Sequence, residues 1–446
     1  MSAVYGEVRE RLRRFASFER TGDAAHLSPP ASTERLLGDL GRPDRRYAIV
    51  HVAGTLGKGL TASMIAAMLA EGGLRTGLYT SPAVLGVRDG IRIDGDPIAE
   101  DAFARSAAAV LAVAESYGDR VPLSAFDLTT ATALLAFAEL GVAWAVVEAG
   151  LGGRDDATNV TAKALAVLTA IDHDHAAVLG PTLEEIAEHK LGILRPGVPA
   201  VVAEQEPAAG EILRRRLAGV EDVAWSEGLR VGTTADGGLE VVWPDGETVR
   251  ARPRPWWPAT VCVPCLKTAL TARERLAAGA VRRDAWTQAA LAVALPGRLE
   301  YREELVWQGT ACGPVVLDGC HSPAAVRACA AQVRAWGVEG YTLVLGLARD
   351  KLTEPLGPAL AALCRRARRV VLAPFDSPRS SPPSVASYLL ESDPGLAPEV
   401  ARTLDEALTR ATASAGRPLV VAGSLYLIRD VLSRLRDPSE SSRAQS

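Results

Sequence analysis

The segment Ile49–Gly59 combines residue types that proteins use to hold phosphate. An apolar run typical of a buried strand ends in a tight turn that carries Lys58 and three glycines, Gly54, Gly57 and Gly59. An amphipathic helix is expected directly afterwards, over Thr61–Leu74. In this order, backbone N–H groups and a helix N-terminus surround one small volume, and the lysine adds a positive charge. The segment therefore predicts a site for a nucleoside triphosphate.

The glycine spacing differs from that of the common phosphate-binding loop. In that loop about four residues separate the first glycine from the Gly-Lys pair, whereas only Thr55 and Leu56 lie between Gly54 and Gly57. Leu56 and Leu60 also stand where small or polar residues are usual. An ordinary glycine-rich turn between a strand and a helix is the alternative for this segment taken alone.

Two further groups of residues have the chemistry of a metal site. Glu148 ends the apolar run Trp144–Glu148 and precedes a glycine-rich stretch, and strand ends of this kind face the ligand crevice of an α/β sheet. His173 and His175 alternate with aspartates after the run Leu165–Ala170, and carboxylates and imidazoles together bind divalent ions. A strand-end salt bridge and solvated loop histidines are the alternatives.

Two weaker features complete the set. Lys190 shares the predicted helix Leu183–Lys190 with three glutamates, and such a run is most often a surface helix with ion pairs. Asp318 and His321 lie on a turn at the end of a predicted strand, which brings a carboxylate and an imidazole to the edge of a sheet.

Segments of strand type and helix type alternate through most of the chain, which predicts an α/β fold with largely parallel sheets. In the first half, the expected strands are Ile49–Ala53, Thr76–Tyr79, Trp144–Glu148, Leu165–Ala170 and Pro199–Ala203. The expected helices are Thr61–Leu74, Glu100–Tyr117, Asp127–Leu140 and Leu183–Lys190.

The second half predicts a change of architecture followed by a second domain. Turn residues between short alternating segments predict an antiparallel ribbon over residues 222–258. The run Leu295–Arg298 is the expected linker, and strand-type runs at 315–317, 341–345, 369–373 and 418–422 then predict a smaller doubly wound domain. The expected domains are therefore 1–296 and 297–446, with a ligand cleft between them.

The composition is that of an ordinary globular protein, with 48% apolar and 23% charged residues. The net charge of −4 gives no electrostatic reason to expect nucleic acid or an anionic membrane as a partner. No apolar run approaches the roughly 20 residues that cross a bilayer, and the N-terminal segment has no apolar signal core, so we expect a cytoplasmic protein. The six cysteines predict packed thiols, and a zinc site or redox motif is the alternative for Cys262 and Cys265.

Taken in order along the chain, these features resemble one family, folylpolyglutamate synthase/dihydrofolate synthase, a branch of the Mur-type amide ligases. The resemblance spans residues 30–435. It is carried by these ordered motifs: HVAGT with GKG at 51–59, GLYTSP at 77–82, EAGLGGR with DATNV at 148–160, Asp174-His175, Lys190, PGRLE at 296–300, DGCH at 318–321 and GSLY at 423–426.

The resemblance implies a Mur-ligase-type P-loop ATPase domain with a parallel sheet and a smaller Rossmann-like C-terminal domain. It also implies an ATP-dependent, ADP-forming ligase that activates a carboxylate as an acyl phosphate and couples it to an amino acid, which in the family means folate and glutamate. The implied cofactors are ATP, Mg²⁺ and a carbamate on Lys190. The expected partners are the small carboxylate and amino-acid substrates, and we expect a monomer.

The resemblance also assigns roles to individual residues. It places ATP against Gly54, Thr55, Gly57, Lys58, Gly59, Thr61, Arg298 and Asp318. It gives magnesium the ligands Ser81, Glu148 and His175. The incoming amino acid would be placed by His321 and Ser424, and the catalytic residues would be Lys58, Lys190 and His321.

The chain departs from the family pattern at several of these places. Leu56 and Leu60 replace an asparagine and a hydroxyl residue of the loop, and Thr61 is the nearest alternative hydroxyl. Lys267 and Ser322 stand where the family has asparagine.

The segment after Ser81-Pro82 also differs, since it has Ala83 in place of a histidine or aromatic residue and Arg88-Asp89-Gly90 in place of an Asn-Glu-Arg run. Three hypotheses follow. In the first, the chain is a folate–glutamate ligase. In the second, it is a ligase of the same chemistry that acts on another acid–amine pair in specialised metabolism. In the third, it is a catalytically impaired relative that serves as a binding or partner protein.

Overall fold

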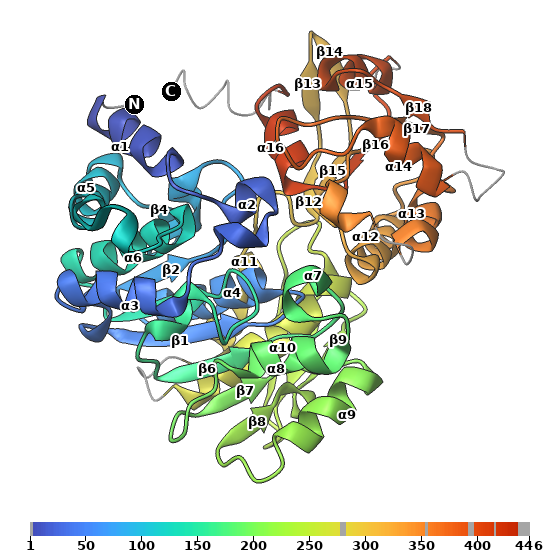
Figure 1. The fold of residues 1–446 in the computed structure, drawn as a ribbon. Helices are drawn as coiled ribbons and strands as arrows, with labels where there is room; N and C mark the ends of the chain where they lie inside the picture. The colour runs from blue at the N-terminus through green and yellow to red at the C-terminus, as the bar shows by residue number, and fades with distance from the viewer. Residues whose placement is uncertain (1–2, 277–281, 353–355, 391–396, 414–415, 436–446) are drawn as a thin grey trace, which may run out of the picture. The chain divides into compact units, whose positions relative to one another are not determined.

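The computed structural model describes residues 3–276, 282–352, 356–390, 397–413 and 416–435. The chain divides into two compact units (Figure 1). Unit 1 comprises Met1–Glu19, Asp23–Trp257 and Val261–Val293, and unit 2 comprises Arg20–Gly22, Pro258–Thr260 and Ala294–Ser446.

Unit 1 is built on an eight-stranded sheet with the order β4-β3-β2-β5-β1-β6-β7-β8. Six strands run parallel: β1 (Ala48–Ala53), β2 (Thr76–Tyr79), β5 (Trp144–Glu148), β6 (Leu165–Leu168), β7 (Ala200–Val202) and β8 (Val223–Trp225). Two antiparallel strands, β3 (Ile91–Ile93) and β4 (Asp96–Pro97), close one edge. The central strands are buried almost throughout, because helices cover both faces of the sheet. The predicted parallel α/β sheet is confirmed.

Helices of unit 1 lie against this sheet (Figure 1). Their side chains form two apolar clusters with it. One cluster joins β1, β2 and β5 to α1 (Ala3–Arg13), α3 (Pro30–Asp39), α5 (Glu100–Tyr117) and α6 (Ala125–Glu139). The other joins β6 and β7 to α8 (Leu183–Leu191) and α9 (Pro207–Arg216). The helix after the glycine-rich loop, α4 (Lys58–Glu71), contacts β1, β2 and β5 and packs against α11 (Arg283–Ala292). Two short helices, α2 (Phe18–Thr21) and α7 (Ala176–Leu179), complete the described α-helices before α9.

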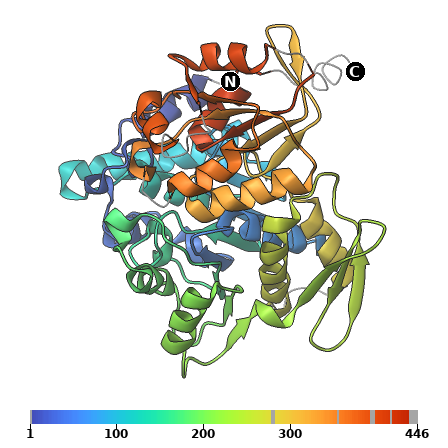
Figure 2. The same cartoon turned by 90° about the vertical axis from the view of Figure 1, so that its right-hand side faces the viewer.

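The predicted ribbon is a three-stranded antiparallel sheet made of β9 (Arg230–Thr233), β10 (Leu239–Val242) and β11 (Thr248–Ala251) (Figure 2). Its predicted start at residue 222 was too early. The segment Val223–Trp225 instead pairs in parallel with β7 as the edge strand of the large sheet, because α9 supplies the crossover that a parallel strand needs. The sheet is followed by α10 (Ala259–Arg275).

Unit 2 contains a six-stranded sheet with the order β12-β15-β19-β16-β17-β18. The four predicted strands are present as β15 (Val315–Asp318), β16 (Thr342–Leu345), β17 (Arg369–Leu372) and β19 (Leu419–Ala422). The prediction missed the edge strands β12 (Glu300–Arg302) and β18 (Glu399–Val400) and the hairpin of β13 (Leu305–Trp307) and β14 (Thr310–Cys312). These strands have two or three residues each, so they lack the apolar run that marks a buried strand.

The helices of unit 2 are α12 (Pro323–Ala335), α13 (Leu356–Cys364), α14 (Pro383–Leu390), α15 (Leu404–Ala411) and α16 (Leu425–Leu432). The alternation of parallel strands and helices confirms a doubly wound unit. Across the described ranges of both units, no helix combines the length and the apolar character needed to span a membrane.

Candidate active site

The glycine-rich loop joins β1 to α4, and its first half is tied to the chain that follows β6. The N–H groups of Thr55 and Leu56 both donate to the carbonyl of Ala170, at 2.9 and 3.1 Å. The Thr55 hydroxyl donates to the Asp172 carbonyl at 3.0 Å and accepts the Asp172 N–H at 3.1 Å. Because these two amides are used within the protein, the amides available for phosphate lie in the second half of the loop.

The second half of the loop opens α4. Gly57 is its N-cap, with φ at 79°, and the first bond within the helix runs from the Thr61 N–H to the Gly57 carbonyl. The N–H groups of residues 58–60 therefore have no partner inside the helix, which is the arrangement that binds phosphate. The Lys58 Nζ lies 3.4 Å from the Thr55 carbonyl, so its charge lies over the loop.

Two loop positions accept only glycine. Gly54 has φ at 146°, and a Cβ there would lie 2.0 Å from Oγ1 of Thr169. A Cβ at Gly57 would lie 2.6 Å from the Sγ of Cys265 on α10. The short loop is therefore packed tightly between the end of β6 and α10, which accounts for its glycines.

A substitution at Gly57 tests this packing. We expect Gly57→Ala to weaken ADP binding at least about tenfold, or about 1.4 kcal/mol, because the added methyl group would displace the loop or Cys265. Gly73→Ala is the matched control, since Gly73 has nearly the same φ, 73°, but a Cβ there meets nothing within 4 Å. Isothermal titration calorimetry with ADP and thermal unfolding of both variants give the comparison. If both substitutions lowered the ADP affinity and the stability to unfolding equally, backbone strain, and not the contact with Cys265, would set the glycine requirement.

The hydroxyl of Thr61 points into the protein. Thr61 is fully buried, and it lies close enough to Cys265 to oppose the rise in that thiol's pKa. Burial raises the pKa of Cys265 to about 11. The role that the resemblance assigns to Thr61 at the nucleotide stays a prediction.

Glu148 and Ser81 meet beside the start of α4. The Ser81 N–H donates to Oε2 of Glu148 at 3.1 Å, and a Cβ at Gly59 would lie 3.1 Å from the same oxygen. Glu148 is only 4% exposed. A carboxylate and a hydroxyl residue are thus brought to the helix N-terminus where phosphate would bind, and oxygen donors are what magnesium prefers. These residues fit a magnesium site.

The third predicted metal ligand, His175, is placed by other contacts. It is the N-cap of α7 with φ at 52°, its Nε2 lies 3.5 Å from Oδ2 of Asp174, and its ring centroid lies 5.9 Å from that of Phe18. Its role beside Ser81 and Glu148 stays a prediction.

Lys190 reaches the loop from a helix whose other face is charged and exposed. Its Nζ donates to the Gly54 carbonyl at 2.7 Å, and the side chain is 3% exposed. Two of the three glutamates of α8 form surface ion pairs as predicted, Glu184 with Arg215 and Glu188 with Arg216, and the third, Glu185, caps the helix with Thr182. One lysine of this surface helix is therefore buried, next to the first glycine of the loop.

In unit 2, Asp318 is buried at the end of β15. Its Oδ2 accepts the N–H of Leu299 and its Oδ1 accepts the N–H of Cys320, both at 2.7 Å. Burial raises the pKa of Asp318, and Arg298 opposes this rise. Asp318, Cys320 and Cys329 place ligand atoms within 4.8 Å of one another, but both carboxylate oxygens already accept a backbone N–H.

The two residues predicted to place the amino acid lie at turns of the same unit. Nδ1 of His321 lies 2.8 Å from the Gly319 carbonyl, and because a carbonyl can only accept, Nδ1 carries the proton and Nε2 is the acceptor nitrogen of the neutral ring. The Ser424 Oγ accepts the N–H of Tyr426 at 3.2 Å and caps α16. His321 follows β15 and Ser424 follows β19, and these strands are parallel neighbours, so their ends share one edge of the sheet.

The positions that depart from the family pattern have structural partners. Lys267 forms an ion pair with Glu204 at 2.6 Å. Ser322 caps α12 and accepts the N–H of Ala325. Cys262 and Cys265 are buried free thiols with a raised pKa, as expected for packed cysteines. The contacts of Thr169, Ala170 and Asp172 with the loop were missed, because no local pattern marks residues that act only through long-range packing.

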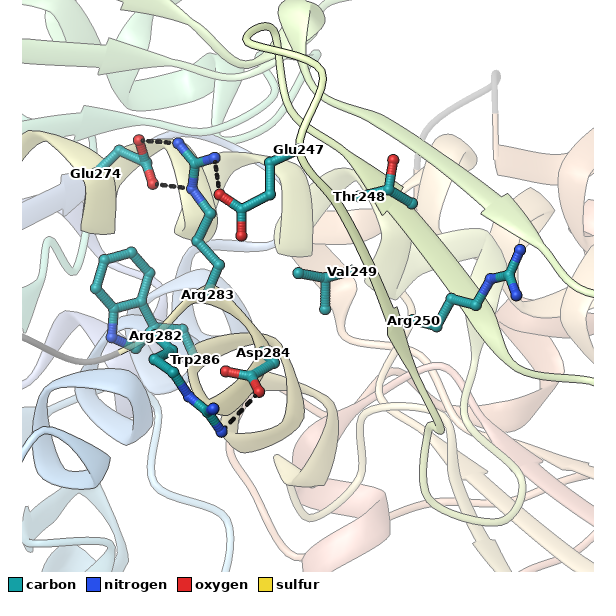
Figure 3. Close-up of a pocket in the computed structure, with 9 residues that line it drawn as sticks. All are labelled: Glu247, Thr248, Val249, Arg250, Glu274, Arg282, Arg283, Asp284 and Trp286. Carbon is teal, nitrogen blue, oxygen red and sulfur yellow. Dashed lines mark hydrogen bonds and ion pairs between the residues drawn. The ribbon is translucent and has the colours of Figure 1, made fainter.

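A hollow of about 610 Å³ lies elsewhere in unit 1, between β11, the end of α10 and the start of α11 (Figure 3). None of the predicted site residues lines it. Its central Arg283 is paired with Glu274 at 2.8 Å and with Glu247 at 2.6 Å. Since it shares no residue with the predicted site, this hollow is distinct from the candidate active site.

Comparisons with known proteins agree with these observations. Residues 297–425 match the family described as Mur ligase, glutamate ligase domain. The dihydrofolate synthase/folylpolyglutamate synthase of Escherichia coli is 30% identical, with 85% of each chain covered, and that of Bacillus subtilis is 29% identical, with 90% of this chain and 94% of the relative covered. A folylpolyglutamate synthase structure from Mycobacterium tuberculosis, complexed with ADP and AMPPCP, has a TM-score of 0.81 at 27% identity and covers 97% of this chain and 98% of its own. The chain belongs to the dihydrofolate synthase/folylpolyglutamate synthase family of Mur ligases.

Proposed function

We propose that the protein is an ATP-dependent, ADP-forming ligase that activates a carboxylate as an acyl phosphate and couples it to an amino acid. A folate and glutamate are the substrate pair that the names of the relatives indicate. The observation that carries the proposal is the convergence of Lys190, Glu148 and Ser81 on the loop and the N-terminus of α4.

In the first step, the substrate carboxylate attacks the γ-phosphorus of ATP and ADP leaves. Phosphoryl transfer between two anions depends mainly on alignment and on neutralisation of charge. The N–H groups that open α4 and the ammonium of Lys58 supply positive charge on the protein side. Ser81 and Glu148, with His175 as the third predicted ligand, would hold Mg²⁺, which neutralises phosphate charge when bound.

Lys190 is proposed to act as a carbamate. A carbamate forms when the neutral amine adds to CO₂ and loses a proton, and it replaces a cation with an anion. This change would place a second carboxylate-type group near the loop, in addition to Glu148. The position of Nζ, buried beside Gly54, supports a role for Lys190 at the nucleotide site.

In the second step, the amine of the amino acid attacks the acyl phosphate and phosphate leaves. The amine must lose a proton, and Nε2 of His321 has the acceptor character to take it in the neutral ring. Ser424 would place the amino acid, and Arg298 and Asp318 would contact the nucleotide. A cytoplasmic monomer that binds no nucleic acid and no membrane is part of the proposal.

A second candidate is the same chemistry on another acid–amine pair. It is favoured by the segment after Ser81, where the family pattern is lost. There Arg88 is engaged inside the protein, with Nε donating to the Ile98 carbonyl at 2.6 Å and a side-chain nitrogen 3.2 Å from Glu100. The segment that follows Ser81 thus differs in sequence from the family pattern, and its Arg88 is bound by residues of this chain.

One assay separates the candidates. Purified protein is supplied with MgATP, bicarbonate and a panel of acids and amines, and ADP and amide product are measured. Product from a folate and glutamate supports the first candidate, and product only from other pairs supports the second. If neither turnover nor nucleotide binding occurs, both are wrong and the protein is a non-catalytic binding or partner protein.

A further inference from the structure

A chain of buried polar side chains lies behind the loop in unit 1. It runs through Lys163, His51, Thr158 and Asp156, and we call these four residues the buried relay. Their exposed fractions are 8%, 0%, 0% and 5%. Burying a lysine and an aspartate is costly unless each is hydrogen-bonded and the charges balance.

The lysine end of the relay has the contacts of an ammonium group. Nζ of Lys163 lies 2.6 Å from Oδ1 of Asn159, 3.1 Å from the Ile193 carbonyl and 3.0 Å from Nδ1 of His51. An ammonium has three N–H donors and no acceptor, so three acceptors match its protonated form. In this arrangement His51 accepts through Nδ1.

The remaining hydrogen bonds then have only one direction. The proton of neutral His51 must lie on Nε2, which donates to Oγ1 of Thr158 at 2.8 Å. Burial lowers the pKa of His51 well below its ordinary value, and Lys163 adds to this effect, so the ring is neutral. The single hydroxyl hydrogen of Thr158 goes to Oδ1 of Asp156 at 2.5 Å. A cation and an anion thus occupy the two ends of one hydrogen-bonded chain.

The relay connects two segments of the candidate active site, the strand that precedes the loop and the segment that follows Glu148. His51 belongs to β1 and lies three residues before Gly54 of the loop. Asp156 accepts the N–H of Leu151 at 2.7 Å, and Leu151 lies three residues after Glu148. The loop and the segment that carries Glu148 are therefore held by the same set of hydrogen bonds.

The relay reaches a third segment, the end of α8, which carries Lys190 (Figure 1). Lys163 binds the carbonyl of Ile193, and Nδ2 of Asn159 donates to the carbonyl of Gly192 at 3.0 Å. These bonds fix the last turn of α8 against the relay. The position of Lys190 therefore depends on them.

We infer that the buried relay is a positioning device which, with Lys163 protonated, holds β1, the segment after Glu148 and α8 in the arrangement that brings Lys190 to the loop. The inference rests on the proposed ligase function, because that function gives Lys190 and Glu148 their roles. The four residues are positioning residues, since they act through others at the site.

The protonation of Lys163 gives this inference a pH signature. The charged and titratable groups that face it are His51 of β1, Asp156 and Arg195, which follows α8. Burial lowers the pKa of Lys163 from 10.5 to about 7, Arg195 lowers it further and Asp156 opposes the change. We therefore expect kcat to fall as the pH rises through about 7, as the relay loses its cation.

Stability is expected to respond in the opposite sense. Between pH about 7 and 10.5 the unfolded chain binds more protons at this lysine than the folded chain does. The contribution of Lys163 to the free energy of unfolding therefore rises over this range. Activity and stability thus move in opposite directions with pH, which a purely structural lysine would not produce.

A pair of variants at Thr158 tests the relay. Thr158→Val keeps the shape and removes both hydrogen bonds of the hydroxyl, to His51 and to Asp156, whereas Thr158→Ser keeps the hydroxyl. We expect Thr158→Val to lower kcat at least about tenfold with KM for ATP changed less than about twofold. The reason is that Lys190 and Glu148 lose their alignment, whereas the N–H groups offered to phosphate are those that open α4 and are also held by the helix itself. Thr158→Ser should stay within about threefold of the wild type in kcat. Equal kcat for the two variants would overturn the inference.

Lys163→Met is the second test. In this variant kcat should no longer fall above pH 7, and the free energy of unfolding should no longer rise over the same pH range, each measured against the wild type. An unchanged pH profile in Lys163→Met overturns the inference, and if this variant does not fold, the Thr158 pair still decides. If the wild type forms no amide with any pair, the proposed function fails. The relay is then tested by the pH dependence of unfolding and by an NMR titration of labelled lysine Cε. A lysine that titrates near pH 7 supports the inference, and the absence of such a lysine overturns it.

Discussion

Lys190→Ala is expected to lower the rate of amide formation strongly while leaving ADP binding within about threefold of the wild type. The lysine is buried beside Gly54, so removing it takes away the group proposed to become a carbamate, whereas the N–H groups that open α4 remain. A loss of about 10³-fold in kcat is the size expected for one preorganised electrostatic group. Steady-state formation of ADP and amide measures it.

Two controls separate the carbamate from a packing effect. Glu188→Ala removes an exposed residue of the same helix, whose ion pair with Arg216 is 3.8 Å long, and should leave kcat unchanged. Removal of bicarbonate and CO₂ should lower wild-type activity, and a short carboxylate such as acetate should restore part of the activity of Lys190→Ala. Full activity in Lys190→Ala would refute the role.

Glu148→Gln is expected to lower turnover by about 10²- to 10³-fold. The amide keeps the volume of the side chain, and its oxygen can still accept the Ser81 N–H, but the negative charge is lost. The variant should need a higher Mg²⁺ concentration for half-maximal activity, and ADP binding in the absence of Mg²⁺ should be unchanged. Titration of activity with MgCl₂ and calorimetry with and without Mg²⁺ give both results.

Glu184→Gln serves as the control for this charge change, because Glu184 is exposed on α8 and pairs with Arg215. It should match the wild type in kcat and in Mg²⁺ dependence. If Glu148→Gln has an unaltered Mg²⁺ dependence, Glu148 is not a ligand and its contact with Ser81 is structural.

Much of the fold could be predicted from local patterns. Apolar runs such as the one that precedes Glu148 became parallel strands, since a strand covered on both faces is apolar along most of its length. The edge strands Glu300–Arg302 and Glu399–Val400 were missed because they are short and lack such a run. The ribbon was predicted correctly as antiparallel. Its first predicted residues, however, pair in parallel with a strand of the large sheet, and no local pattern encodes that pairing.

The sequence named residues for the candidate site but said less about how they are arranged. Glu148 was expected at a strand end and lies there, beside Ser81 and Gly59. Lys190 was on a helix whose pattern indicates a surface, and only the family resemblance marked it for the site. Thr61 was expected to offer a hydroxyl to the nucleotide; its side chain lies buried near Cys265, and this role stays a prediction.

The sequence was sufficient to predict the alternation of the main strands and helices, the glycine-rich loop with its one lysine, and the family. These follow from periodicity, from turn residues and from motif spacing, which are properties of neighbouring residues. The tertiary structure alone decided which loop amides remain for phosphate, because the carbonyl of Ala170 takes two of them. It also brought Lys190 to Gly54 across 136 positions of the chain and joined Lys163 to His51 across 112. Hydrogen bonds between residues so far apart depend on how the helices pack on the sheet, and no local pattern fixes that packing.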